Sequence, residues 1–585
     1  MMRPFTIIVL VLFTIPVLSF SQQLPFSTAN VTLPQLAYSA CGWGDFDQDG
    51  DLDLALTGAE GNTPVTKIFR NDHGNFTDIQ ANLLALHFGS LEWGDYDNDG
   101  DLDLLVTGMD SQGNSHTVIF DNINGTFIDS GISFPGIADG QASWGDFNND
   151  GNPDILLAGN SMVRIYENNG DRQFAIINST LPSMESAMCS WNDYNNDGQS
   201  DVLVCGSMGG GIFSSLFRND HGVFTEVNIS PEPFTGLYSG QARWADLDND
   251  GDQDLVIAGM DLNMDGYFLL YRNDGNDHFT KFDANTVRLL NPSFDLGDFN
   301  GDGLLDIILM GTVSGCGGTA VTILKQNEGF MNFLDVSSLL PGYKQGGVTW
   351  GDYNNDGFTD LLFTGLDAFD VPKTGLYLNT LGDTLLFTVN TPPSAPQGLN
   401  ATMDAGKAIL HWNSAADTQT PKGSLSYNIR IGSLPDSQEI LSPLAMLYSG
   451  SRKIAAPGNA SADTSWVITG IPPGTYYFSV QCIDNGFKAG VFSGPCMFTY
   501  APVGIDETKV SGLSLSPNPC HDRLYFNDGT ISTDDFRVRI INANGNNCHE
   551  SVNPKVVDVS AWPNGIYLVH ATNSRETKSF KFIKN

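Results

Sequence analysis

Positive charge is scarce in this chain, and its scarcity limits the partners that the chain can bind. The 585 residues include 28 Lys and Arg against 67 Asp and Glu, which gives a formal net charge of −39. A surface of this sign repels the phosphates of nucleic acids and the head groups of anionic lipids. The composition therefore excludes nucleic acid as a partner and favours cations as ligands.

Long apolar runs are missing beyond the N-terminus. Residues 1–21 combine Arg3, an apolar run over 5–18 and the small residues Ser19 and Ser21, a pattern typical of a secretory signal peptide. No later stretch approaches the roughly 18 apolar residues that a membrane-spanning helix needs. We therefore expect an exported protein that begins near residue 22 and has no transmembrane segment.

Catalytic signatures are also missing. The sequence has no HExxH, GxSxG or P-loop motif, and its nine His are scattered. His73 and His221 occupy equivalent "RNDHG" turns, which indicates a role in hairpins. The Gly-rich stretch at 206–211 has no following Lys or helix and is interpreted as a loop. Nothing here indicates an enzyme of a familiar class.

The eight cysteines of an exported chain can form disulfides. Three local pairings are compatible with the sequence: Cys189 with Cys205, Cys482 with Cys496, and Cys520 with Cys548. Cys41 and Cys316 have no obvious mate. Buried free thiols, acting as small apolar side chains, are the alternative for each pair.

One acidic pattern occurs seven times. Copies such as "WGDYDNDGDLDLLVTG" from Trp93 and "WGDFNNDGNPDILLAG" from Trp144 have their first Asp at 45, 95, 146, 193, 246, 298 and 352, so the period is 47 to 54 residues. Each of six copies precedes a strand, an Asn/Asp/Gly turn and another strand, as in "KIFRNDHGNFTDI" from Lys67. One unit is therefore four short strands, and seven such units predict a seven-bladed β-propeller over 22–390.

The sequence also bears on how the units pack against one another and on which segment completes the ring. A Trp recurs before the acidic loop in six copies, which favours a packing role over ligand stacking. The segment 24–34 resembles an outer strand and could complete the last unit. Residues 385–390 compete for the same place, and the sequence leaves the choice open.

The acidic loops have the composition of a calcium site. Oxygen ligands fall at loop positions 1, 3, 5 and 9, the carbonyl of position 7 completes the set, and Gly at position 6 allows a sharp turn. The absence of Cys and His indicates a hard cation, and the ligand number favours Ca²⁺ over Mg²⁺. The apolar residue at position 12 excludes an EF-hand. The sequence thus predicts up to seven structural calcium ions.

The predicted ligand positions, loop by loop, are Asp45, Asp47, Asp49, Asp51 and Asp53; Asp95, Asp97, Asp99, Asp101 and Asp103; Asp146, Asn148, Asp150, Asn152 and Asp154; Asp193, Asn195, Asp197, Gln199 and Asp201; Asp246, Asp248, Asp250, Asp252 and Asp254; Asp298, Asn300, Asp302, Leu304 and Asp306; and Asp352, Asn354, Asp356, Phe358 and Asp360.

The sevenfold loop closely resembles the FG-GAP/VCBS repeat of the integrin α-subunit propeller and of many secreted bacterial proteins. The resemblance covers about residues 25–390. It implies that the calcium loops join the first two strands of each blade on one face. It also implies that partners meet the loops of the opposite face. The sixth copy departs from the pattern with Leu296 in place of Trp and Gly301 at loop position 4.

Two small β-sandwich domains are expected after the propeller. Residues 391–501 resemble a fibronectin type III domain, with Trp412 in the core and Tyr476 as the inward member of the Tyr476–Tyr477 pair. After a linker at 502–510, residues 511–585 resemble the C-terminal sorting domain of type IX secretion cargo, with an "SPNP" opening and an "NGIYLV" strand. That resemblance implies handling by the type IX machinery and a secreted or surface-bound product.

The functional expectation is a non-catalytic, calcium-binding adhesion or binding module for an extracellular glycan or protein. The loops between the second and third strands differ most among the repeats, and such loops on a rigid scaffold usually carry recognition. The alternative is a calcium-dependent polysaccharide lyase or glycoside hydrolase. That chemistry needs an acid or base outside the repeat pattern.

Overall fold

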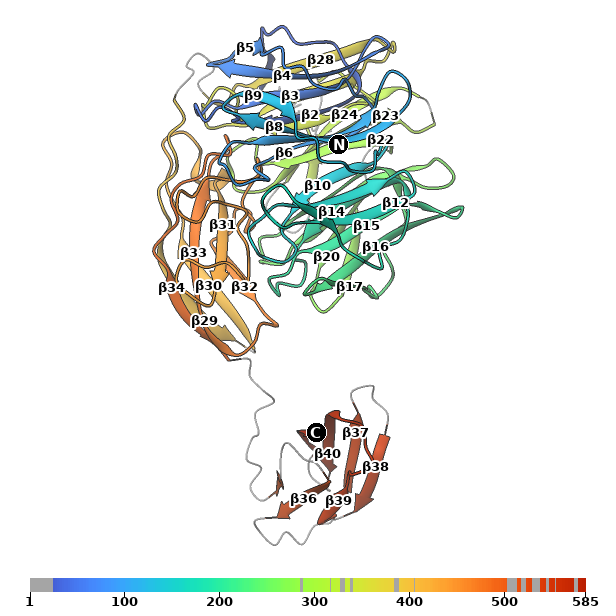
Figure 1. The fold of residues 1–585 in the computed structure, drawn as a ribbon, viewed down its shortest axis with the longest axis vertical. Coiled ribbons are helices and arrows are strands. Elements are labelled where there is room, and N and C mark those ends of the chain that lie inside the picture. Colours follow the sequence, from blue (N-terminus) through green and yellow to red (C-terminus); the bar gives the residue numbers. More distant parts are fainter. Residues whose placement is uncertain are drawn as a thin grey trace, which may run out of the picture. The chain divides into compact units, whose positions relative to one another are not determined.

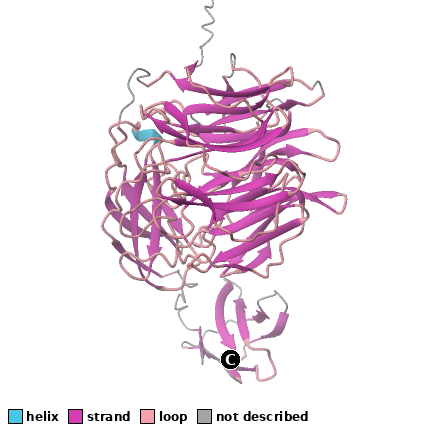
Figure 2. Cartoon of the chain, turned by 45° about the horizontal axis from the view of Figure 1, so that its top comes forward, coloured by secondary structure: helices cyan, strands magenta, loops and turns pink. Residues whose placement is uncertain are grey.

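The computed structural model describes residues 25–284, 288–315, 317–326, 332–336, 340–382, 389–404, 406–501, 513–516, 522–528, 537–542, 547–552, 554–572 and 577–584. The signal-peptide and linker predictions, at 1–21 and 502–510, fall outside these residues. Strands joined by loops make up almost all of the described chain (Figures 1 and 2). Among the described residues, no helix has the length and apolar character needed to cross a membrane.

Seven four-stranded antiparallel sheets follow one another along the first 380 residues. The first strands are β2 (Ala37–Gly44), β6 (Leu91–Gly94), β10 (Gln141–Gly145), β14 (Glu185–Asn192), β18 (Tyr238–Ala245), β22 (Leu289–Gly297) and β26 (Val348–Gly351). The second strands are β3 (Asp53–Glu60), β7 (Asp103–Met109), β11 (Asp154–Gly159), β15 (Asp201–Met208), β19 (Asp254–Met260), β23 (Asp306–Val313) and β27 (Asp360–Leu366).

In the first five sheets the outer half is the predicted hairpin; the sixth sheet also ends in two consecutive strands, whereas the outermost strand of the seventh is the N-terminal β1. The third strands are β4 (Thr63–Asp72), β8 (Ser115–Ile123), β12 (Met162–Asn168), β16 (Gly211–Asp220), β20 (Gly266–Asn273), β24 (Thr319–Gln326) and β28 (Pro372–Asn379). The fourth strands are β5 (Asn75–Asp78), β9 (Thr126–Asp129), β13 (Phe174–Ile176), β17 (Val223–Glu226), β21 (Phe279–Asp283), β25 (Phe333–Asp335) and β1 (Phe26–Thr28).

The sheets close into a ring. Each first strand contacts the first strand of the next sheet, and β26 returns to β2. The fourth strand of the last sheet is β1, which pairs antiparallel with β28 so that Phe26 lies opposite Asn379. The N-terminal segment therefore closes the ring, which answers the question that the sequence left open. The competing segment, 385–390, lies mostly outside the described residues.

The recurrent Trp side chains pack between neighbouring sheets, as predicted. Trp93 is buried and stacks on Phe46 of the preceding sheet, with ring centroids 6.1 Å apart and planes 12° apart. A Cβ atom on Gly44 would lie 2.8 Å from the Trp93 ring, so the preceding strand needs glycine there. The second strands are buried along almost their whole length, which explains their apolar runs.

Residues 391–501 form two three-stranded sheets that enclose one core. One sheet contains β29 (Gln397–Asp404), β30 (Lys407–Asn413) and β32 (Ser465–Ile468), and the other contains β31 (Ser426–Gly432), β33 (Gly474–Ile483) and β34 (Cys496–Tyr500). A 3-10 turn covers Lys422–Ser424. Tyr476 is buried, and its hydroxyl donates to the Pro472 carbonyl at 2.7 Å, so the prediction of the inward tyrosine is confirmed.

The C-terminal part is a separate compact unit with its own core. Its first sheet contains β35 (Leu513–Ser516), β36 (Arg523–Asp528) and β39 (Val556–Asp558). Its second sheet contains β37 (Arg537–Asn542), β38 (Asn547–Val552), β40 (Gly565–Thr572) and β41 (Thr577–Lys584).

Two of the proposed disulfides are wrong, because Cys189, Cys205, Cys482 and Cys496 are free thiols. Cys189 lies opposite Val204 on adjacent strands, so Cys189 and Cys205 point to opposite faces of the sheet and enter different cores. Cys496 lies opposite Phe478, four residues from Cys482, which separates the two thiols by about 13 Å along the strand. Cys316 and Cys520 are outside the described residues. The third predicted pairing, Cys520 with Cys548, therefore stays a prediction.

Candidate functional site

Each acidic loop is held by hydrogen bonds between its own carboxylates and backbone. In the second loop, the Asp95 carboxylate accepts the backbone N–H groups of Asp99 and Gly100 at 3.1 and 3.2 Å, and Asp99 accepts that of Asp101 at 2.9 Å. Gly100 has φ of +100°, a conformation that favours glycine at position 6. The spacing seen in the sequence therefore folds the loop around its acidic side chains.

The Asp at position 9 is buried in all seven loops, with no more than 1% of its surface exposed. Asp103 accepts the backbone N–H of Tyr96 at 3.2 Å and that of Asn122 at 2.8 Å, and it is 1% exposed. Burial raises the pKa of Asp103 to about 8 and that of Asp53 to about 9. A carboxylate placed this deep needs a positive charge nearby if it is to be ionised at neutral pH.

Three loops bring three carboxylates together, with one oxygen of each within 4.8 Å of the others. These groups are Asp45, Asp47 and Asp53; Asp95, Asp97 and Asp99; and Asp246, Asp248 and Asp250. The other four loops have Asn at position 3. Carboxylate, amide and carbonyl oxygens are the donors that a hard divalent cation prefers, so the residues present fit the predicted ion.

In four loops the side chain at position 7 accepts a hydrogen bond from position 4 of the preceding loop; these side chains are Asp51, Asp101, Asn152 and Asp252. Asn152 accepts a hydrogen bond at 2.8 Å from Asn98, which is at position 4 of the preceding loop. Asn98 has φ of +64°, and position 4 is left-handed in all seven loops. This explains the departure in the sixth copy, because Gly301 adopts that conformation without strain.

A ring of buried amide side chains was missed by the sequence reasoning. Asn71, at the end of β4, donates to the Leu52 carbonyl at 3.0 Å and to the Tyr353 carbonyl of the preceding sheet at 2.8 Å. Equivalent bonds join every pair of neighbouring sheets and come from Asn122, Asn168, Asn219, Asn273, Gln326 and Asn379. The sequence does contain a signal for this ring, because an Asn or Gln recurs at the end of each third strand. An amide at that place is also typical of the turn that follows, so the pattern alone does not indicate a bond between sheets.

Replacement of Asn71 by Ala is expected to lower the free energy of unfolding by about 3 kcal/mol, because buried carbonyls on two sheets lose their donor. Asn75 in the same hairpin is the matched control, since it is exposed and donates only to the Asp72 carbonyl. Asn75→Ala should change stability by less than about 0.5 kcal/mol. Equal effects of the two substitutions in urea unfolding would contradict the bridging role.

The domain at 391–501 covers the face of the ring that carries the acidic loops. The Asp95 N–H donates to the Lys453 carbonyl at 2.8 Å, and the Lys453 ammonium, which is 6% exposed, donates to the Gly151 carbonyl. Ser424 donates to Asp298 at 2.8 Å, and Asn485 donates to the Gly357 carbonyl at 2.8 Å. Because strands alternate in direction, the loops between second and third strands lie at the other face.

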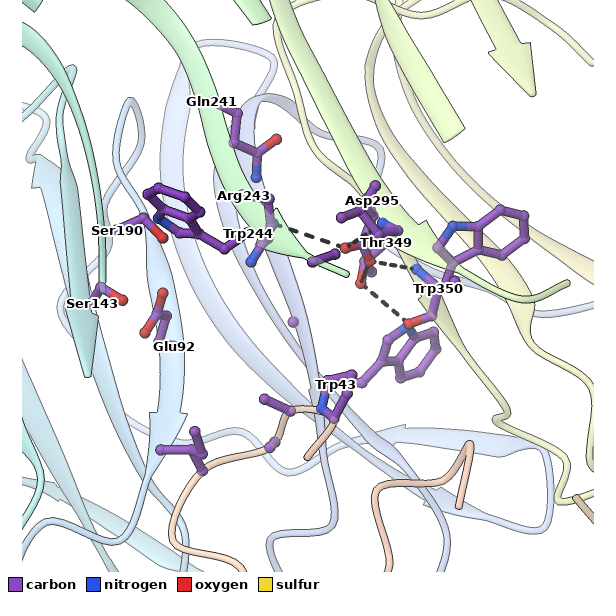
Figure 3. A pocket seen from close by; sticks show the side chains of 18 of the residues that line it. Trp43, Glu92, Ser143, Ser190, Gln241, Arg243, Trp244, Asp295, Thr349 and Trp350 are labelled. Atoms are coloured by element: carbon purple, nitrogen blue, oxygen red, sulfur yellow. Dashed lines mark hydrogen bonds and ion pairs between the residues drawn. The ribbon is translucent and has the colours of Figure 1, made fainter. Parts of the chain in front are cut away.

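A cavity of about 830 Å³ occupies the centre of the ring. The residue before each Trp position lines it, and these residues are Gly42, Glu92, Ser143, Ser190, Arg243, Asp295 and Thr349. Figure 3 shows Glu92, Arg243 and Asp295 around this space. The sequence pattern does not single them out, because it consists of what the repeats share, whereas these positions differ from one repeat to the next.

Two acidic side chains in this cavity, which is called the central channel below, accept hydrogen bonds from the backbone that surrounds it. Glu92 accepts the Trp144 N–H at 3.0 Å, and burial raises the pKa of Glu92 to about 7. Asp295 accepts the Trp350 N–H at 3.0 Å. The Arg243 Nε lies 3.9 Å from an Asp295 oxygen (Figure 3). Two carboxylates and one guanidinium thus face a common space outside the repeat pattern.

Comparisons with solved structures return diverse proteins. A lectin of Agrocybe aegerita that specifically recognises non-reducing terminal N-acetylglucosamine is 19% identical, covering 52% of this chain and 80% of the lectin, with a TM-score of 0.34. The extracellular domain of a protein described as a hybrid two component system of B. thetaiotaomicron is 8% identical, over 96% and 98%, with a TM-score of 0.35. A thermostable family-43 glycoside hydrolase is 10% identical, over 54% and 98%, with a TM-score of 0.25.

Two protein families match separate regions of the chain. No curated protein matches it. A secretion system C-terminal sorting domain matches residues 514–585, which confirms that prediction and indicates secretion and cell-surface localisation through the type IX machinery. FG-GAP-like repeats match residues 45–106, 95–157, 146–204, 193–257, 246–309 and 298–363, which together span more than half of the chain. The chain therefore belongs to the family of proteins built from FG-GAP-like repeats.

Proposed function

We propose that the protein is a calcium-stabilised binding module, displayed or released outside the cell, whose partner is a glycan or a protein. The observation that carries the proposal is the coverage of one face of the ring. The domain at 391–501 contacts the acidic loops, while the loops between second and third strands make up the opposite rim. A partner then meets the rim where the repeats differ most.

Exposed apolar side chains on this rim support a binding role. They are Met208, Phe213, Leu262, Met264, Phe369 and Val371, two on each of three loops, and Phe369 is 86% exposed. Side chains of this kind, when they gather on one face, commonly mark interaction sites. The rim is therefore the proposed interface.

Calcium has a structural part in this proposal. Each of the seven loops would hold one Ca²⁺ through its side-chain oxygens at positions 1, 3, 5 and 9. The ion would neutralise the carboxylates that lie beside the core and so fix the loops on which the domain at 391–501 rests. We further propose that this domain is fibronectin type III-like, an assignment supported by the Tyr476 hydroxyl bond to the backbone four residues upstream.

The proposal is tested by applying the full chain, with calcium, to a glycan array and by incubating it with polysaccharides in a reducing-sugar assay. We expect retention on the array without release of reducing ends. Phe369→Ala should weaken retention about tenfold, as loss of an exposed aromatic anchor commonly does. Tyr448→Ala is the control, because Tyr448 is fully exposed on the domain at 391–501.

The second candidate function is the polysaccharide lyase or glycoside hydrolase, and it is favoured by Glu92 and Asp295. These acids lie in the channel, outside the repeated loops, as such an enzyme would require. Release of reducing ends by the wild-type chain, lost in Glu92→Gln, would replace the binding proposal with this one. If Phe369→Ala and the wild-type chain are retained equally on the array, the rim is not the binding interface.

A further inference from the structure

The mouth of the central channel has an unusual backbone. Seven residues, one at or just before the start of each first strand, have φ between 45° and 55°, and none of them is glycine. They are Tyr38, Phe88, Asp139, Ser186, Ser239, Asn291 and Gln345. This left-handed conformation is costly for ordinary side chains, above all for aromatic ones such as Tyr38 and Phe88. Its recurrence in every sheet indicates that the fold imposes one backbone geometry while the side chains differ.

Backbone hydrogen bonds link part of this mouth directly. The Tyr38 N–H donates to the Gln345 carbonyl at 2.6 Å, the Phe88 N–H to the Tyr38 carbonyl at 3.0 Å, and the Asp139 N–H to the Phe88 carbonyl at 2.8 Å. A fixed backbone that presents varied side chains around an opening is well suited to recognition, because the ligand does not have to order it.

The mouth offers an apolar platform beside polar groups. The rings of Tyr38 and Phe88 lie with their centroids 4.3 Å apart, and Phe88 is 39% exposed. Next to them, the Ser186 hydroxyl donates to the Asp139 carboxylate at 2.6 Å. All four residues line the cavity. Such a surface matches a ligand with one apolar face and polar groups at its edge.

Deeper in the channel, hydrogen-bonding groups remain available. Among the described residues, Arg243 makes an ion pair with Asp295 but no hydrogen bond, and its side chain is 44% exposed. A guanidinium has five N–H donors, and each carboxylate can accept more bonds than it receives from the wall. Donors from Arg243 and acceptors from Glu92 and Asp295 therefore face the same space (Figure 3).

We propose that the central channel is a binding site for a neutral sugar ring, which enters past Tyr38 and Phe88 and hydrogen-bonds to Arg243 and Glu92. A pyranose has an apolar face of C–H groups for the platform and hydroxyls that both donate and accept. Acidic side chains outnumber guanidinium groups in the lining of the channel, which disfavours an anionic ligand. The cavity volume of about 830 Å³ falls within the range of small-molecule sites.

The test titrates the full chain, with calcium, against methyl glucopyranoside, methyl galactopyranoside and methyl mannopyranoside at millimolar concentrations. Binding is followed by calorimetry and by indole fluorescence, since six Trp line the channel. We expect at least one glycoside to bind. Arg243→Met should weaken its affinity tenfold or more, Phe88→Ala should also weaken it, and Tyr448→Ala should leave it unchanged. Glucuronate, the anionic counterpart, should bind more weakly than the glucoside.

The proposal fails if no glycoside in the panel gives heat or a fluorescence change, or if Arg243→Met and Tyr448→Ala bind alike. A melting temperature of Arg243→Met equal to that of the wild-type chain verifies that a loss of binding is not a loss of folding. This site is separate from the rim, so the two proposals fail independently. Phe369→Ala should lower retention on the array and leave the affinity for the methyl glycoside unchanged.

Discussion

Chelation of calcium is expected to lower the melting temperature of the full chain by about 20 °C. At free calcium ten times the dissociation constant, each site adds about 1.4 kcal/mol to the free energy of unfolding, so seven sites add about 10 kcal/mol. That sum is comparable to the whole stability of a typical domain, and a large domain loses about 2 °C or more for each kcal/mol. Thermal melts with and without EDTA measure the shift.

The pH dependence of this shift provides an internal control. In the metal-free protein, the pKa of Asp53 is raised to about 9 and that of Asp103 to about 8 by burial. Folding then favours the protonated carboxyls, so the metal-free protein loses stability as the pH rises from about 4 towards 9. The difference in melting temperature between the calcium-loaded and chelated protein should therefore be larger at pH 8 than at pH 5. A melt unchanged by EDTA at pH 8 would contradict the calcium assignment.

Deletion of residues 511–585 is expected to abolish export across the outer membrane and leave the protein in the periplasm. These residues form a compact unit with its own core, and the match to a sorting domain covers 514–585. Their removal should therefore leave the rest of the chain folded while it takes away the signal that the type IX machinery recognises. Cell fractionation with an antibody against the propeller measures the outcome.

A fusion provides the matched control for this deletion. Residues 511–585 attached to a periplasmic reporter should carry the reporter to the cell surface, whereas the reporter alone should stay in the periplasm. Continued export of the truncated chain would contradict the sorting role, and so would a fused reporter that remains periplasmic.

Much of the fold followed from the repeats, because a buried strand and a sharp acidic turn recur with the same spacing. Trp93 in the packing between sheets and Tyr476 in the core of the next domain were predicted from their positions alone. The position of each acidic loop between a first and a second strand was predictable too. Asp103 ends its loop and begins β7, as the pattern required.

Features that depend on contacts between distant parts of the chain could not be read from the sequence. Phe26 closes the ring by pairing with a strand more than 350 residues away, and either of two segments had the right composition. Lys453 reaches the acidic loops from another domain, which no local pattern records. Cys189 and Cys205 were close in sequence, yet the register of their strands turns them to opposite faces. Arg243 was overlooked because its position is the one that does not repeat.

The number of calcium ions bound per chain tests the central claim most directly. The purified protein, equilibrated with calcium and dialysed against metal-free buffer, is measured by elemental analysis against its protein concentration. One ion for each of the seven loops is expected, with a decrease of one ion when Asp95 and Asp103 are replaced together by Asn. A calcium content near zero, or a content unchanged by that double substitution, would contradict the account.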